Sequence, residues 1–195
     1  MHNTKLVILG RDGILNVYRE GHVTAPQEWH PIPGAMDAVA RINQAGWHTV
    51  VATNQSGIGR GMIDMTAVNA VHAHMHKQMQ TQGARIDAVF FCPHTPEEGC
   101  DCRKPKPGLM LDIGRRYGVD LASVPMVADT ARDLLAAQAA GCEPHLVLTG
   151  KSAPFAAGGQ PDGLPTGTVL HRDLAAFVDF ILARSTAVSE SHQKP

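Results

Sequence analysis

Long apolar runs and an excess of basic residues are both missing from this sequence of 195 residues. No apolar stretch approaches the roughly 20 residues that a helix needs to cross a bilayer. The first apolar run, residues 6–9, is too short for the core of a secretory signal, so we expect a soluble, cytoplasmic protein with no membrane partner. Because 17 Lys and Arg are balanced by 18 Asp and Glu, we also expect no nucleic-acid partner. Any anion-binding site must therefore be local.

Internal repeats, an interdomain linker and a second domain are also absent from the pattern. A chain of this length that is 44% hydrophobic suits one compact domain with a core of its own. We assign residues 1–184 to that domain and residues 185–195 to a polar, flexible C-terminal tail. Cysteine is scarce: of four residues, three fall between positions 92 and 102, and Cys142 stands alone as a small buried side chain. Clustered cysteines in a cytosolic protein indicate a metal site rather than disulfides.

Short β-like runs alternate with helical patterns along the whole chain. The predicted strands are residues 5–9, 47–52, 86–91, 125–128, 145–148 and 168–170. The predicted helices are residues 35–45, 66–82 capped by Thr66, 107–117, 131–140 and a last one capped by Asp173 and reaching about residue 184; residues 150–167 form a loop. Such alternation is typical of a doubly wound α/β fold with a parallel sheet covered on both faces. Ligands bind such sheets at the carboxyl ends of the strands, so functional residues should follow strands.

A Cys-x-His and a Cys-x-Cys pair follow the third predicted strand. Three thiolates and one imidazole form the closed tetrahedral ligand set of a structural zinc ion, here Cys92, His94, Cys100 and Cys102. The simpler alternative is three free cysteines and a surface histidine. A bound zinc would stiffen a loop that has little core of its own, and would so fix the position of the two cations that follow it, Arg103 and Lys104.

Four polar segments follow successive strands: residues 11–13, 53–57, 103–108 and 129–133. The second brings hydroxyl, amide and backbone N–H groups that suit a phosphate, and the third brings three cations. The fourth brings carboxylates that suit a magnesium ion. Taken singly, these segments also fit a plain turn, a solvated basic loop and a helix cap. Together they lie where one phosphorylated ligand could contact all of them.

These residues resemble the haloacid dehalogenase superfamily. The matching motifs, in order, are Leu9-Gly10-Arg11-Asp12-Gly13, Thr53-Asn54-Gln55-Ser56-Gly57, Cys100-Asp101-Cys102-Arg103-Lys104-Pro105 and Val127-Ala128-Asp129 with Asp133. The cysteine loop makes the chain similar to the branch that contains heptose-bisphosphate 7-phosphatases and histidinol phosphatases. The resemblance covers about residues 5–183 and implies a haloacid-dehalogenase-like fold with a zinc-clamped loop, no large cap domain and a monomeric state.

The resemblance also implies roles for individual residues. Asp12 would be the general acid and base, and Thr53 and Lys104 would stabilise the transferring phosphoryl group. Asp129 would hold Mg²⁺ together with the backbone carbonyl of Asp12. The phosphosugar would be bound by Thr53 and Lys104 and by the further set Tyr18, Arg19, Glu20, Gly21, Asn54, Gln55, Ser56 and Arg103.

The first motif departs from the family pattern Asp-x-Asp-Gly, because Gly10 stands where the nucleophilic aspartate is expected. Glycine can form no phosphoenzyme and gives magnesium no carboxylate ligand. The fourth motif of the family is Gly-Asp-Lys, and this chain has Ala128-Asp129-Thr130 in its place. Thr130 therefore stands where the family pattern has a lysine, and that cation is also missing. The zinc ligands and the pocket residues Thr53, Arg103 and Lys104 still match the family pattern.

Two interpretations remain open. The chain is either a family phosphatase with one changed residue, acting on the 7-phosphate of a heptose bisphosphate in surface-sugar synthesis or on histidinol phosphate, or an impaired pseudo-phosphatase that binds a phosphosugar or a partner. Both predict binding, and Gly10 predicts poor hydrolysis in either case. A zinc-ribbon module for nucleic acid fits poorly, because the charge is balanced.

Overall fold

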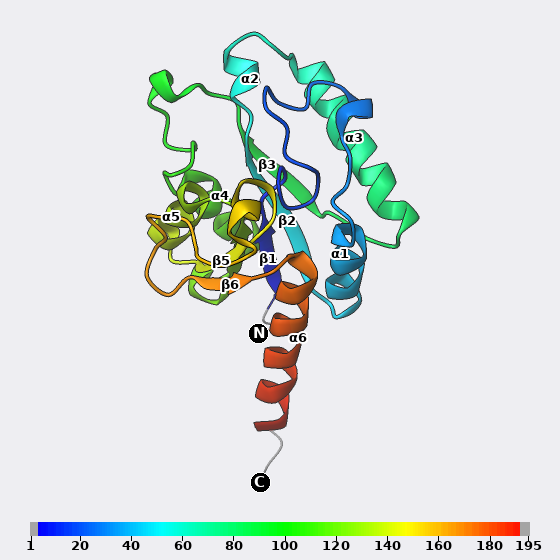
Figure 1. The fold of residues 1–195 in the computed structure, drawn as a ribbon, viewed down its shortest axis with the longest axis vertical. Coiled ribbons are helices and arrows are strands. Elements are labelled where there is room, and N and C mark those ends of the chain that lie inside the picture. Colours follow the sequence, from blue (N-terminus) through cyan, green and yellow to red (C-terminus); the bar gives the residue numbers. More distant parts are fainter. Residues whose placement is uncertain (1–3, 192–195) are drawn as a thin grey trace.

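Six parallel strands form one sheet in the structure, a computed structural model that describes residues 4–191. In sequence order the strands are β1 (Leu6–Leu9), β2 (His48–Asn54), β3 (Ala88–Cys92), β4 (Pro125–Ala128), β5 (Glu143–Val147) and β6 (Val169–His171). Their order across the sheet is β3-β2-β1-β4-β5-β6, and every neighbouring pair is parallel. The predicted doubly wound α/β fold is confirmed, with β1 at the centre of the sheet (Figure 1).

Helices cover both faces of this sheet (Figure 1). One face is packed by α1 (Ala35–Gln44), α3 (Met65–Thr81) and α6 (Leu174–Ser191), and the other by α4 (Gly108–Tyr117) and α5 (Ala131–Ala140). Side chains of β1 alternate between the two cores: Val7 and Leu9 pack with the first set, and Leu6 and Ile8 with the second. All four are buried, because a strand in the middle of a covered sheet meets apolar layers on both sides.

The helix ends differ in part from the prediction. The helix predicted to start at Thr66 is capped instead by Asp64, whose Oδ1 accepts the N–H of Ala67 at 2.7 Å. Asp173 caps α6 as predicted, accepting the N–H of Ala176 at 2.8 Å, but the helix runs to Ser191 rather than ending near residue 184. The first part of the segment predicted to be a flexible tail is therefore helical, and residues 192–195 lie outside the described range.

The connections contain short elements that the pattern did not predict. These are α2 (Ser56–Gly59) and the 3₁₀ turns η1 (Pro26–Glu28), η2 (Pro96–Glu98), η3 (Leu121–Ser123) and η4 (Gly150–Phe155). Strand β2 also runs on through Thr53 and Asn54, which were assigned to the turn after it. Within residues 4–191 no segment forms a large cap over the sheet, and no helix is long and apolar enough to span a membrane.

Candidate active site

A pocket opens at the carboxyl end of the sheet, where β1, β2, β4 and β5 end. Its lining comes from loops that are far apart in the sequence: Arg11, Asp12, Tyr18, Arg19, Gly21, His22, Thr53, Asn54, Ser56, Arg103, Lys104, Asp129, Thr130, Arg132, Asp133 and Lys151. Strand ends converge here because all six strands run the same way, and so the loops that follow them share one edge of the sheet.

Gly10 directly follows β1 and is buried beside β4, where its N–H donates to the carbonyl of Val127 at 2.9 Å. A Cβ built on Gly10 would lie 3.0 Å from Cγ1 of Ile14 and 3.7 Å from the carbonyl oxygen of Val127. The first contact is tight, so a Cβ at this position requires a movement of a few tenths of an ångström by Ile14. Ile14 is itself a buried side chain of the core.

Asp12 is held firmly in place beside the pocket. Its two carboxylate oxygens each accept from Nη2 of Arg11 at 3.1 Å, and Oδ1 also accepts from Nδ2 of Asn16 at 2.9 Å. Asn16 is buried, whereas the Asp12 side chain is partly exposed, so the carboxylate is clamped on one side and open on the other. That arrangement suits a fixed group that exchanges a proton with a ligand.

Arg11 is buried and links Asp12 to two other elements. Its Nη1 lies 3.1 Å from Nε2 of His72 on α3. With the amide of Gln55 turned so that its oxygen faces Arg11, that oxygen lies 3.1 and 3.3 Å from the two guanidinium nitrogens. Burial, and next the Arg11 charge, lower the pKa of His72 to about 4, so near neutral pH His72 is an uncharged acceptor for the Arg11 proton.

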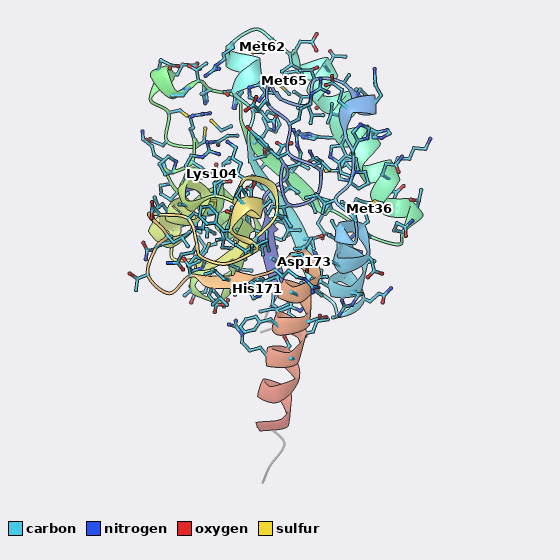
Figure 2. All side chains as sticks on the ribbon, viewed as in Figure 1. Met36, Met62, Met65, Lys104, His171 and Asp173 are labelled. Atoms are coloured by element: carbon cyan, nitrogen blue, oxygen red, sulfur yellow. The ribbon has the colours of Figure 1, made fainter. Side chains whose placement is uncertain are left out.

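Lys104 is a buried cation in the lining of the pocket, and Figure 2 labels its place in the fold. Its side chain is 2% exposed, and Nζ donates to the carbonyl of Ala52 and to Oδ2 of Asp133, both at 2.8 Å. Asn54 fixes the Lys104 backbone by accepting its N–H and donating to its carbonyl, each at 3.2 Å. Burial works against the Asp133 charge, but the Lys104 ammonium and then Arg132 hold the pKa of Asp133 below its ordinary value.

Asp129 follows β4 and is also buried. Burial raises its pKa to about 6, opposed by the Lys151 N–H, which donates to Oδ2 at 2.8 Å. Gly13 packs against this carboxylate with a φ of +79°, and a Cβ there would lie 2.1 Å from Oδ2 of Asp129. Glycine at position 13 is therefore required both by the backbone conformation and by the close approach of Asp129.

The mouth of the pocket carries three more cations. Nζ of Lys151 lies 4.7 Å above the ring of Tyr18, and Arg19 pairs with Glu28 at 2.9 Å. Nη1 of Arg103 donates to the backbone carbonyl of His94 at 3.1 Å. Arg103 thus connects the pocket to the cysteine loop.

The four residues of that loop converge as a set. One ligand atom from each of Cys92, His94, Cys100 and Cys102 lies within 4.8 Å of all the others. Their closest contacts are 3.3 Å, between Sγ of Cys102 and Nδ1 of His94, and 3.5 Å, between the sulfurs of Cys100 and Cys102. This cluster could hold a metal ion, and its donor set and spacing fit tetrahedral zinc. Burial raises the pKa of the Cys92 thiol to about 12, so a cation is the natural means of stabilising its thiolate.

The pocket brings together most of the residues that the sequence singles out. Among the residues expected to contact the substrate, Glu20 and Gln55 lie outside the lining. Gln55 instead forms hydrogen bonds with Arg11 and Thr53, which do line the pocket. Sequence reasoning missed His22, Arg132 and Lys151 as lining residues. Lys151 lies four residues after the end of β5, in the segment that was assigned to a loop, so the sequence marks its region but not the residue itself. No comparable signal marks His22, which has a φ of 75°.

Known proteins resemble this chain over nearly its whole length. A family model described as HAD-hydrolase-like matches residues 101–171. The D-glycero-beta-D-manno-heptose-1,7-bisphosphate 7-phosphatase of Bordetella bronchiseptica is 50% identical over 178 residues, which are 91% of this chain and 98% of that protein. The protein of the same name from Pseudomonas aeruginosa is 46% identical over 177 residues, with coverage of 91% and 97%.

Solved structures agree with this likeness. The D,D-heptose 1,7-bisphosphate phosphatase of B. bronchiseptica, crystallised with magnesium and phosphate, superposes with a TM-score of 0.87 at 49% identity, covering 93% of this chain and 99% of that one. The corresponding phosphatase of Burkholderia thailandensis gives a TM-score of 0.71 at 45% identity, with coverage of 92% and 99%.

Proposed function

The chain belongs to the family of D-glycero-beta-D-manno-heptose-1,7-bisphosphate 7-phosphatases, and we propose that its pocket binds a phosphosugar of this class with the 7-phosphate at Lys104. Membership of the haloacid dehalogenase superfamily is confirmed, and the relatives support a phosphoric monoester hydrolase. The convergence of Thr53, Lys104 and Asp12 in one pocket, with the cations Arg103 and Lys151 at its mouth, carries the proposal.

In this arrangement the phosphate to be cleaved lies between Thr53 and Lys104. A hydroxyl and a buried ammonium can stabilise the phosphoryl group there as charge develops on its oxygens. Asp12, held by Arg11 and Asn16, donates a proton to the leaving sugar oxygen. The rest of the sugar extends toward Tyr18, Arg19 and Gly21, with Arg103 and Lys151 available for its second phosphate.

Hydrolysis by this chain is slow because Gly10 supplies no nucleophile. Asp12 cannot replace the missing carboxylate, since residues two apart on an extended chain are displaced by about 6 to 7 Å. Three hydrogen bonds also hold the Asp12 carboxylate where it is. In-line attack on phosphorus tolerates little such displacement. The protein therefore functions better as a binder of its phosphosugar than as a catalyst.

Zinc at the cysteine cluster has a structural role in this proposal. With all four positions filled by side chains, no coordination site is left for a water molecule. The ion would fix His94, whose carbonyl accepts from Arg103, and would so hold that guanidinium at the pocket. We further propose that the protein is a cytoplasmic monomer.

Release of inorganic phosphate from D-glycero-D-manno-heptose 1,7-bisphosphate and from histidinol phosphate tests the proposal, using the natural chain, Gly10→Asp and Gly10→Asn. Asn has the size of Asp but is no nucleophile, so it is the matched control. We expect Gly10→Asp to exceed the other two by at least about four orders of magnitude, as removal of a nucleophile costs in other enzymes. The heptose bisphosphate should be preferred.

Two results would overturn parts of this account. Turnover by the natural chain of about 1 per second or more would mean that another group attacks phosphorus. A strong preference of Gly10→Asp for histidinol phosphate would replace the proposed substrate with the amino-alcohol phosphate.

A further inference from the structure

A turn after β5 contacts both segments that carry the expected magnesium ligands, Asp12 and Asp129. This β5 turn comprises residues 149–152 and leads into η4. In the sheet, β4 lies between β1 and β5. The β5 turn therefore reaches across the end of β4 to meet the loop after β1, at a sequence separation of 136 residues. This contact joins the ends of three strands at the pocket.

Three donors of the β5 turn are directed at these two segments. Oγ1 of Thr149 donates to the backbone carbonyl of Gly13 at 2.6 Å. The N–H of Lys151 donates to Oδ2 of Asp129 at 2.8 Å, and Oγ of Ser152 donates to the backbone carbonyl of Asp129 at 2.7 Å. Ser152 is buried, so water does not compete for its hydroxyl. The turn thus holds the loop after β1 at one point and Asp129 at two.

Two glycines let the three segments approach one another closely. Gly13 has a φ of +79° and Gly150 a φ of +53°. A Cβ on Gly150 would overlap both Cα of Gly13 and Oδ2 of Asp129, and a Cβ on Gly13 would overlap the same oxygen. Because only glycine leaves this space free, backbone atoms of the two loops enclose Oδ2 of Asp129.

The expected magnesium ligands suit that ion. Mg²⁺ is usually bound by one or two carboxylates while waters and phosphate oxygens complete its octahedron, and here Asp129 offers a carboxylate and Asp12 a backbone carbonyl. The peptide that carries this carbonyl is fixed, because the N–H of Gly13 donates to the carbonyl of Asn16 at 2.8 Å. Gly10 adds no side-chain oxygen, so cation binding depends on how well the two remaining ligands are positioned.

From these contacts we propose that the β5 turn positions the magnesium ligands, with Thr149 and Ser152 as positioning residues for the reaction of the family. The inference rests on the proposed function, since it takes Asp129 as a ligand of the cation. The Lys151 N–H and the two glycines enclose Oδ2, so Oδ1 is the oxygen of Asp129 that faces the pocket and binds the ion. Groups that hydrogen-bond the ligands of a metal fix their orientation and so raise metal affinity.

Titration of the zinc-loaded protein with Mn²⁺ alone, followed by electron paramagnetic resonance, tests this proposal. Mn²⁺ takes the same carboxylate and carbonyl ligands as Mg²⁺ and gives a signal of its own. Thr149→Val keeps the shape of the side chain and removes the donor, whereas Thr149→Ser keeps the donor. We expect Thr149→Val and Ser152→Ala each to weaken Mn²⁺ binding by about tenfold. Thr149→Ser should restore binding to within about twofold of the natural chain.

Thr49→Val is the matched control for a purely structural effect. Thr49 is buried and its hydroxyl donates to the backbone carbonyl of Arg85, but it lies at the amino end of β2, on the edge of the sheet opposite the pocket. Because this change also leaves a carbonyl without its donor, it should lower the free energy of urea unfolding at least as much as Thr149→Val does. We expect its Mn²⁺ affinity to stay that of the natural chain. An equal loss of Mn²⁺ affinity in the two variants would overturn the proposal.

Different results would overturn the positioning role and the proposed function. A natural chain that binds no Mn²⁺, or a Thr149→Val variant that binds it as tightly as the natural chain, would overturn the positioning role and leave the proposed function standing. Isothermal titration with the heptose bisphosphate in excess magnesium tests the function separately. Failure of the natural chain to bind this ligand would overturn the proposed function, whatever the Mn²⁺ titrations give.

Discussion

Replacing Lys104 by methionine should destabilise the protein strongly, because it breaks a buried ion pair from one side. Lys104 is 2% exposed and Asp133 is 9% exposed at the side chain, and Nζ also satisfies the carbonyl of Ala52. Removing one partner of such a pair typically costs about 3 to 5 kcal/mol, because the other charge stays buried. Arg132 still contacts Oδ1 of Asp133 at 3.1 Å, so we expect a loss near the lower limit, about 3 kcal/mol.

Lys106→Met is the matched control, two residues further along the same loop. Its ammonium pairs with Asp101 at 3.2 Å, but the Asp101 side chain is 99% exposed. An exposed pair of this kind contributes at most about 1 kcal/mol, so the control should unfold nearly as the natural chain does. Urea unfolding at pH 7, followed by circular dichroism, gives the two free energies of unfolding.

The pH dependence of the Lys104→Met effect gives a second check. In the natural chain the pKa of Asp133 is below its ordinary value of 3.8. The ionised Asp133 therefore stabilises the folded protein fully at pH values above 3.8. This stabilisation is lost as the pH falls through the lower pKa of the folded state. Without Lys104, burial raises the pKa of Asp133 instead, and protonation on acidification relieves the buried charge. The stability difference between variant and natural chain should therefore shrink from pH 7 to pH 5. A stability difference between Lys104→Met and the natural chain of less than about 1 kcal/mol at pH 7 would refute this reasoning. A difference that increases from pH 7 to pH 5 would refute it as well.

Two further predictions concern metal and acid. We expect elemental analysis to find one zinc per chain in the natural protein and in Cys142→Ser. Cys100→Ser should lose this zinc and unfold at a lower temperature than the natural chain. A natural chain without zinc would contradict this prediction. His145 and His171 form a buried pair, with Nδ1 of the first 2.9 Å from Nε2 of the second, and burial lowers both pKa values below 6.5. At acidic pH the unfolded chain then binds more protons than the folded chain, so the free energy of unfolding should fall as the pH drops below about 6.5. In His145→Gln it should fall less steeply. Parallel plots of this free energy against pH for the two proteins would refute the prediction.

The sequence pattern predicted the sheet well, because it depends on local periodicity. The strand 125–128 and the helix 131–140 have the bounds that apolar spacing and Gly141 indicate. The start of α3 was wrong by two residues, because Asp64 and Thr66 are both good caps and only the path of the chain selects between them. The end of α6 was also wrong, since polar residues after Arg184 continue the helix without a terminating glycine or proline.

The site was predictable where a motif is local and was missed where contacts are long-range. The cysteine loop brings all its ligands within eleven residues, and its convergence needs only a turn. By contrast, the contact of Arg11 with His72 joins residues 61 apart, and no spacing rule indicates it. Lys151 lies in a segment assigned to a loop, and its place over Tyr18 follows from the fold alone. The missing cation at Thr130 is partly offset by Arg132 and Lys151, which line the same pocket.

We attribute the poor hydrolysis to Gly10, since Arg132 and Lys151 partly offset the missing cation at Thr130. Acid quenching during exposure to heptose 1,7-bisphosphate and magnesium, followed by mass spectrometry of the peptides, tests this attribution directly. We expect Gly10→Asp to gain the mass of one phosphoryl group on the peptide that contains residue 10, and the natural chain to gain none. A phosphorylated natural chain, with the group on Asp12 or Asp129, would contradict the account, and so would a folded Gly10→Asp that binds the bisphosphate but is never phosphorylated.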